Sequence, residues 1–70
     1  MVDIDYFELS ESTLEELSGQ GDTEAMLALA LGLYFGSFGE MDADSAYDWF
    51  SKAYRKGEVK AAPFLAEMIY

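Results

Sequence analysis

The chain has 70 residues, of which 14 are acidic and four are basic, so its formal net charge is −10. A chain of this length forms one domain at most, and an apolar fraction of 51% with 16% aromatic residues is too high for a disordered chain. Cysteine and histidine are both absent, which excludes disulfide frameworks, thiolate chemistry and the commonest general base, so we expect no enzyme activity, no metal site and no cofactor.

The first predicted helix lies within residues 3–18. Residues 2–6 alternate apolar and acidic side chains, as a strand does, but no partner strand follows. We therefore favour a helix that begins near residue 3 or 5. Ser12 and Glu15 have the spacing of a capping box, and glycines at 19 and 21 break the chain after this helix.

The second predicted helix starts after Asp22, which is a good N-cap, and it runs through Tyr34 to a stop at Gly36. Its residues are apolar all round. A helix of this kind is typically buried on every side. We therefore expect it to be the central helix of an all-α fold.

Two further helices complete the prediction. The third is capped by Asp42 or Asp44, runs to Lys56 and ends at Gly57; the fourth runs from Val59 to the C-terminus. Three- and four-residue steps give the third helix an apolar face. The predicted core combines one or more residues of each helix: Leu14, Leu17, Leu29, Leu33, Ala46, Trp49, Phe50, Ala53 and Leu65.

The chain matches itself when it is displaced by 36 residues, the separation between Gly21 and Gly57. The matched positions are Gly21-Asp22 with Gly57-Glu58, Ala25 with Ala61, Leu29-Ala30 with Leu65-Ala66, and Tyr34 with Tyr70. Sequence periods of this size indicate stacked helical hairpins. Such hairpins pack closely where small alanine residues recur at fixed steps.

A block of the third helix carries a resemblance to a known family. The block is Ala46-Tyr47-Asp48-Trp49-Phe50-Ser51-Lys52-Ala53, preceded by Ala25, Leu29, Gly36 and Asp42 and followed by Gly57. It resembles the Sel1-like repeat, a relative of the tetratricopeptide repeat, over residues 21–70. Residues 1–20 then read as a divergent helix from a preceding repeat. The chain departs from the family pattern at Ala30, Phe38 and Ser45.

The resemblance implies antiparallel helical hairpins and an interaction scaffold that binds a peptide or protein. Because a repeat needs neighbours to bury its faces, we expect either a unit that closes on itself or one that self-associates. The side chains that we expect to serve as exposed aromatic anchors are Phe38, Tyr47 and Tyr54. This adaptor role is the alternative to a function carried by charge.

The charge is distributed unevenly along the chain. Twelve acids and no base lie between Met1 and Ser51, and all four bases lie between Lys52 and Lys60. Such a molecule repels nucleic acids and anionic membranes and attracts a basic protein surface. There is no basic signal segment, and the longest apolar run, residues 25–35, is too short to span a membrane. We therefore expect a cytoplasmic protein.

A helix from Asp5 would carry a row of charges on one face. The predicted acidic site consists of Asp5, Glu8, Glu11 and Glu15 on this helix, with Asp44 and Asp48 on the third. Along a helix the charges would rise by about 4.5 to 6 Å per step, comparable to about 3.4 Å per phosphate in a nucleic acid strand. The leading hypothesis is therefore a polyanion mimic that occupies a nucleic-acid-binding surface. The simpler interpretation is that the acids only confer solubility.

In size and acidity the chain also looks like small phage-encoded inhibitors of bacterial defence, including acidic anti-CRISPR proteins, which would act in the host cytoplasm. A calcium loop at Asp42–Asp48 is not expected. The EF-hand pattern needs glycine at its sixth position and glutamate at its twelfth. Those positions hold Tyr47 and Ala53.

Overall fold

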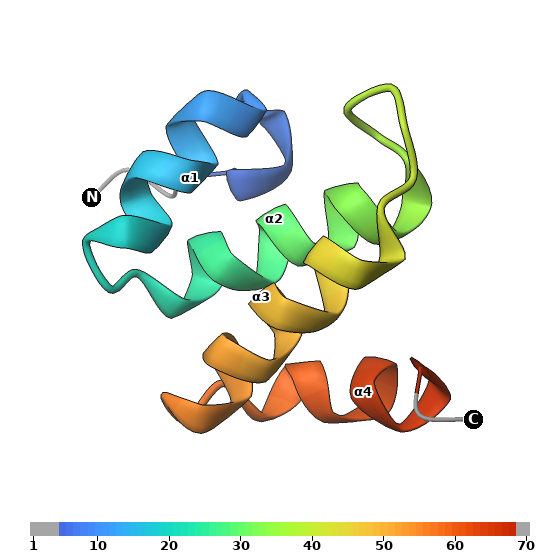
Figure 1. Cartoon of the computed structure of the whole chain (residues 1–70). Helices are drawn as coiled ribbons and strands as arrows, with labels where there is room; N and C mark the ends of the chain where they lie inside the picture. The colour runs from blue at the N-terminus through green and yellow to red at the C-terminus, as the bar shows by residue number, and fades with distance from the viewer. Residues whose placement is uncertain (1–4, 69–70) are drawn as a thin grey trace.

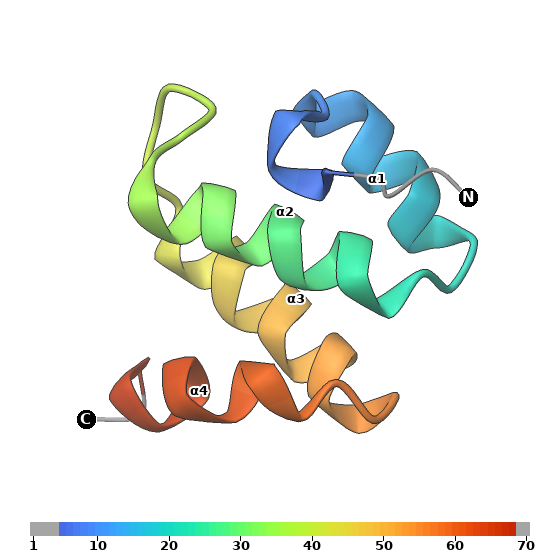
Figure 2. The same cartoon turned by 180° about the vertical axis from the view of Figure 1, so that it is seen from behind.

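The computed structural model describes residues 5–68, and every regular element within them is helical, which confirms the all-α prediction (Figures 1 and 2). The chain order is η1 (Tyr6–Glu8), α1 (Glu11–Gly19), α2 (Thr23–Phe35), α3 (Ala43–Arg55), η2 (Val59–Ala61) and α4 (Ala62–Met68). The η elements are single turns of 3₁₀ helix. In both views α1 and the loop after α2 lie on one side of α2, and α3 and α4 lie on the other.

The prediction of one helix from residue 3 or 5 is wrong at its N-terminal end. Leu9 and Ser10 are both extended, with ψ angles of 150° and 160°, and they separate η1 from α1. Ser10, and not Ser12, is the N-cap, since the Thr13 amide donates to its hydroxyl at 3.3 Å. A serine three residues before a free amide satisfies one of the donors that a helix leaves unpaired at its start. Residues 3 and 4 lie outside the described residues.

The boundaries of α2 and α3 agree closely with the sequence. The carboxylate of Asp22 accepts from the amides of Glu24 and Ala25 at 3.1 and 3.2 Å, and Gly36 ends α2 with a φ of 77°. Asp42 caps α3 by accepting from the Ser45 amide at 3.1 Å. Both α2 and α3 therefore begin at an aspartate whose side chain replaces a missing backbone acceptor.

The two glycine turns that the 36-residue displacement relates have the same geometry. Gly21 and Gly57 have φ angles of 95° and 103°, a region that glycine reaches without steric cost. The next amide in each turn donates to a carbonyl of the preceding helix: Asp22 to Leu17 at 3.1 Å, and Glu58 to Ala53 at 2.9 Å. The turns that follow α1 and α3 thus have the same local geometry.

Helix α2 is buried along most of its length, as its apolar composition predicts. It packs between α1 and α3, which accounts for the need for apolar residues on more than one face. The buried apolar residues of the described chain are Leu14, Ala25, Met26, Leu27, Ala28, Leu29, Ala30, Leu33, Ala46, Phe50, Ala53 and Ala61.

An aromatic cluster joins α2, α3 and α4. The ring of Phe50 is fully buried and stacks on Phe64 with centroids 5.0 Å apart, and Tyr34 meets both rings edge-on at 6.1 Å. Edge-to-face and offset arrangements of this kind add to the energy of burying the rings. The cluster holds α4 across α3.

Three predicted core residues, Leu17, Trp49 and Leu65, are only half-buried at the edge of the core. Trp49 lies on the flank of α3, where the ammonium group of Lys52 sits 4.6 Å from its ring centroid. The negative face of an aromatic ring attracts a cation in this position electrostatically. Periodicity identified the correct helix face but not which of its two edges is covered.

The last helix begins later than predicted. Val59–Ala61 forms η2, and α4 starts at Ala62. Pro63 has no amide hydrogen and cannot donate to the carbonyl of Val59; the Ala62 amide donates to it instead, in the 3₁₀ pattern. The predicted extension of this helix to Tyr70 lies outside the described residues.

Candidate interaction surface

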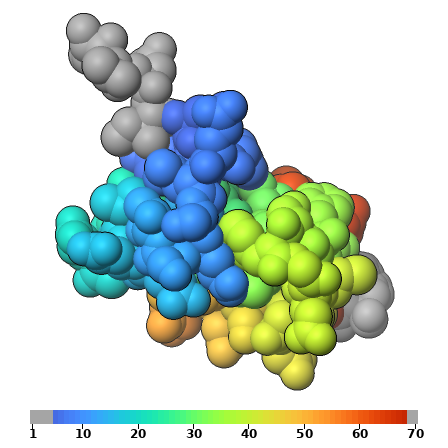
Figure 3. Space-filling view, turned by 90° about the horizontal axis from the view of Figure 1, so that it is seen from above, coloured from blue at the N-terminus to red at the C-terminus, as the bar shows by residue number. Residues whose placement is uncertain are grey.

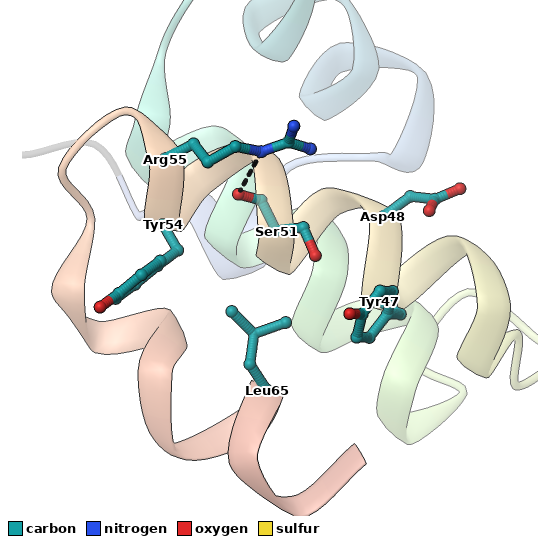
Figure 4. Close-up of a pocket in the computed structure, with 6 residues that line it drawn as sticks. All are labelled: Tyr47, Asp48, Ser51, Tyr54, Arg55 and Leu65. Atoms are coloured by element: carbon teal, nitrogen blue, oxygen red, sulfur yellow. Dashed lines mark hydrogen bonds between the residues drawn. The ribbon is translucent and has the colours of Figure 1, made fainter. Parts of the chain in front are cut away.

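A groove between α3 and α4 brings together residues from both predicted sites (Figure 4). It has a volume of about 380 Å³ and is lined by Tyr47, Asp48, Ser51, Tyr54, Arg55 and Leu65. All but Leu65 belong to α3. In Figure 4 the Leu65 side chain points from α4 toward α3, and Asp48 extends away from it at the rim.

The two tyrosines of this groove are the exposed aromatic residues that the sequence predicted on α3. Tyr47 is 41% exposed and Tyr54 is 49% exposed. They lie seven residues apart, which places them two turns apart on the same helix face. The Arg55 Nε donates to the Ser51 carbonyl at 3.3 Å, which directs the guanidinium along the helix (Figure 4). The groove therefore offers aromatic, hydrogen-bonding and charged groups together, as peptide-binding surfaces do.

A second hollow shares Tyr47 with this groove and is lined by Tyr34, Ala43, Asp44, Tyr47, Glu67 and Met68. The Tyr34 hydroxyl donates to the Glu67 carboxylate at 3.4 Å. Asp44 lies one turn before Asp48 on α3, and both are exposed. The predicted acidic pair of α3 thus shares one helix face, next to the tyrosines.

The predicted row of four acids near the N-terminus is not one helix face. Only Glu11 and Glu15 lie on α1, one turn apart; Glu8 belongs to η1. Asp5 precedes η1, and its carboxylate caps that turn by accepting from the Phe7 amide at 3.1 Å. The break at Leu9 and Ser10 removes the regular spacing on which a phosphate-like row depends.

Two groups within residues 5–68 have a shifted pKa. Hydrogen bonds from the Ser45 backbone and hydroxyl stabilise the charged form of Asp42 and lower its pKa below the usual aspartate range. The Tyr6 hydroxyl donates to the Asp22 carboxylate at 2.9 Å, and this hydrogen bond, with burial and the negative charge of Asp22 and Glu24, raises the pKa of Tyr6. Asp42 is itself the N-cap of α3, and Tyr6 is bonded to Asp22, the N-cap of α2.

The third predicted anchor, Phe38, is half-buried and constrained, contrary to the expectation of a free aromatic. Its ring lies against the backbone of α2 at Gly32, where an added Cβ would meet the ring at 2.1 Å. The large apolar residues that are instead exposed, and that the sequence did not single out, are Phe7, Phe35, Met41 and Val59. A signal for Phe35 was present, because a helix that is apolar all round but packed on two sides leaves some apolar surface uncovered.

Within residues 5–68, no three aspartate or glutamate side chains gather as metal ligands would. No helix in the same range is long and apolar enough to cross a membrane. Searches against protein-family models, curated proteins and solved structures find no match for this chain.

Proposed function

We propose that this protein is a non-enzymatic acidic binding protein that occupies a basic, nucleic-acid-binding surface of a partner protein by polyanion mimicry. The observation that carries the proposal is the run of twelve acids without a base from Met1 to Ser51. Of the six acids in the predicted site, five are exposed and Glu11 is partly exposed. Their charges are therefore available to a partner.

The mimicry works through negative charge that is spread over two helices. It does not need a row of charges with the spacing of phosphates. Glu11 and Glu15 form one pair on α1, and Asp44 and Asp48 form another on α3. Within each pair the charges rise by about 6 Å along the helix axis. Such a field accelerates encounter with a basic cleft and acts over a Debye length of about 8 Å at physiological ionic strength.

A protein of this kind inhibits its partner by competition. An acidic domain that fills a nucleic-acid channel excludes the nucleic acid and needs no catalytic group. The small size and the acidity of the chain favour one kind of inhibitor, a phage-encoded protein that acts on a bacterial defence system such as CRISPR-Cas.

The test begins with a partner purified by affinity capture at low salt. Its association rate with the protein should fall steeply as salt rises, and duplex DNA or RNA should compete for the same site. Two double charge reversals, Glu11→Lys with Glu15→Lys and Asp44→Lys with Asp48→Lys, should each slow association and leave the fold intact. The reason is that Glu15, Asp44 and Asp48 are exposed and Glu11 is partly exposed. Affinity that is flat across salt, without competition by nucleic acid, would contradict the proposal.

A Sel1-like adaptor that binds a peptide or protein is the second candidate, and the α3–α4 groove favours it. Tyr47 and Tyr54 flank Leu65 in this groove, and aromatic residues of this kind often supply most of the binding energy of an interface. The repeated glycine turns support the same family resemblance. For this candidate, Tyr47→Ala and Tyr54→Ala should weaken binding strongly, and salt should have little effect.

A further inference from the structure

An aromatic cleft lies on the side of α2 turned away from α4. We define it by Phe7 of η1, Leu31 and Phe35 of α2, and Phe38 of the loop that joins α2 to α3. Its volume is about 160 Å³. Seen from above, the blue N-terminal segment and the yellow-green loop lie on opposite sides of this face (Figure 3).

Hydrogen bonds hold both walls of the aromatic cleft in place. In the loop, the Ser37 amide donates to the Gly32 carbonyl at 2.8 Å and the Asp42 amide donates to the Leu33 carbonyl at 2.9 Å. On the other wall, the bond between Tyr6 and Asp22 fastens η1 to the start of α2. The cleft is therefore formed before any ligand arrives, which lowers the entropic cost of binding.

The rim of the cleft exposes two large aromatic side chains. Phe7 is 70% exposed and Phe35 is 63% exposed. Aromatic surface left in water beside a cavity is typical of an interaction site. An apolar cavity of about 150 Å³ holds a benzene molecule, so this cleft has room for one bulky apolar side chain.

An acidic hollow adjoins the aromatic cleft and shares Phe38 with it. Its volume is about 250 Å³, and its carboxylates come from Glu11, Glu40 and Asp42. The hydrogen bonds from Ser45 favour the charged form of Asp42. A ligand that reaches past Phe38 therefore leaves an apolar environment and enters a negatively charged one.

We infer that the aromatic cleft binds a bulky apolar side chain of a partner protein, and that the acidic hollow binds a lysine or arginine close to it in the partner's sequence. The ligand is thus an amphipathic, basic segment. This inference deepens the proposed function and rests on it for the sign of the partner's charge. It adds an apolar anchor, which a purely electrostatic mimic does not need.

A second copy of the chain fits this site less well than a basic partner does. Each copy has a formal net charge of −10, and the acidic hollow lies at the rim that the second copy would have to approach. Like charges brought together at an interface repel each other. Charge complementarity therefore selects a cationic ligand.

The inference can be tested with three short amidated peptides and the ¹⁵N-labelled protein. The first peptide alternates pairs of lysine and leucine, the second has alanine in place of each leucine, and the third has glutamate in place of each lysine. The first should shift the amide resonances of Gly32, Ser37 and Gly39 in a saturable way. The second should bind at least about tenfold more weakly, as the loss of one apolar anchor implies, and the third should not bind.

Two matched variants test whether the lysine–leucine peptide binds in the aromatic cleft. Phe35→Ala should weaken binding of the lysine–leucine peptide about tenfold, which corresponds to about 1.4 kcal/mol. Val59→Ala removes an apolar side chain that is also 70% exposed but belongs to η2, and it should leave the affinity unchanged. Equal affinities of the first two peptides, or no effect of Phe35→Ala, would overturn the inference.

Two further outcomes separate this inference from the proposed function. If alanine and leucine peptides bind equally and salt weakens both, the apolar anchor is refuted while the electrostatic function stands. If salt does not weaken the binding of the lysine–leucine peptide, the acidic hollow has no role and the inference is refuted. The proposed function also rests on Glu15, Asp44 and Asp48, which lie outside this hollow, and it fails only if salt has no effect on binding of the partner itself. Shifts of the same three amides with protein concentration alone would mean that a second copy occupies the cleft, and would also refute the basic ligand.

Discussion

The loop after α2 packs against Gly32, and this packing is possible because glycine has no side chain. The Phe38 ring occupies the space where a Cβ would stand, at 2.1 Å. Gly32→Ala should raise intrinsic helix propensity but displace this ring, and we expect a net loss of about 1 to 3 kcal/mol in the free energy of unfolding, as for other overpacked sites. Chemical denaturation followed by Trp49 fluorescence measures it.

Gly19 provides the matched control, because nothing lies within 4 Å of a Cβ built there and the residue is helical. Gly19→Ala should therefore stabilise the protein by roughly 0.5 to 1 kcal/mol. The same substitution thus has opposite signs at two helical glycines. If Gly32→Ala also stabilised, the contact between Phe38 and α2 would not be a constraint, and the loop wall of the aromatic cleft would be mobile.

At the scale of a helix, the start of α3 depends on the ionisation of Asp42. The folded-state pKa of this carboxyl is lowered by the hydrogen bonds from Ser45. Its contribution to stability is therefore complete above the ordinary aspartate pKa of about 4 and is lost as pH falls through the lowered value. Asp42→Asn keeps an N-cap acceptor without a titrating group.

We expect the protein to lose less thermal stability on acidification when it carries Asp42→Asn than when it is unmodified. The two proteins differ in one ionisable group, so the difference between their melting curves isolates Asp42. An NMR titration of the Ser45 amide should give a midpoint below the ordinary aspartate value. A difference that does not change between neutral and acidic pH would show that the cap does not sense ionisation.

The sequence predicted α2 and the ends of α3 because their signals are local. Asp22, Gly36 and Asp42 each act on atoms within a few residues, so a cap can be read without knowing the fold. Competing local signals caused the error at α1. Ser10 and Ser12 both resemble N-caps, and Ser10 is the cap because the extended backbone of Leu9 and Ser10 ends there, which the sequence does not specify.

At the scale of the whole molecule, the candidate surfaces depend on contacts between distant segments and were harder to predict. Tyr47 and Tyr54 were predicted as exposed anchors together with Phe38, from the resemblance to the repeat, and these two are exposed. The aromatic cleft was missed, since it forms where η1 and the loop after α2 approach the same side of α2. The half-burial of Trp49 was missed for the same reason, because helix periodicity does not say how far a neighbouring helix extends.

The net charge itself leads to the last prediction, which concerns the free protein. A formal charge of −10 on 70 residues destabilises the compact state by self-repulsion, and salt screens it as the Debye length falls from about 30 Å at 0.01 M to about 8 Å at 0.15 M. The melting temperature should therefore rise over this range of sodium chloride. Glu15→Lys changes the net charge from −10 to −8 and should reduce the rise, whereas Lys60→Glu changes it to −12 and should increase it; both residues are exposed.

A melting temperature that falls with salt, or one that responds equally in both variants, would mean that the acids repel each other too weakly to matter. The same field would then be too weak to attract a basic partner, so this measurement bears on the proposed function before any partner is known.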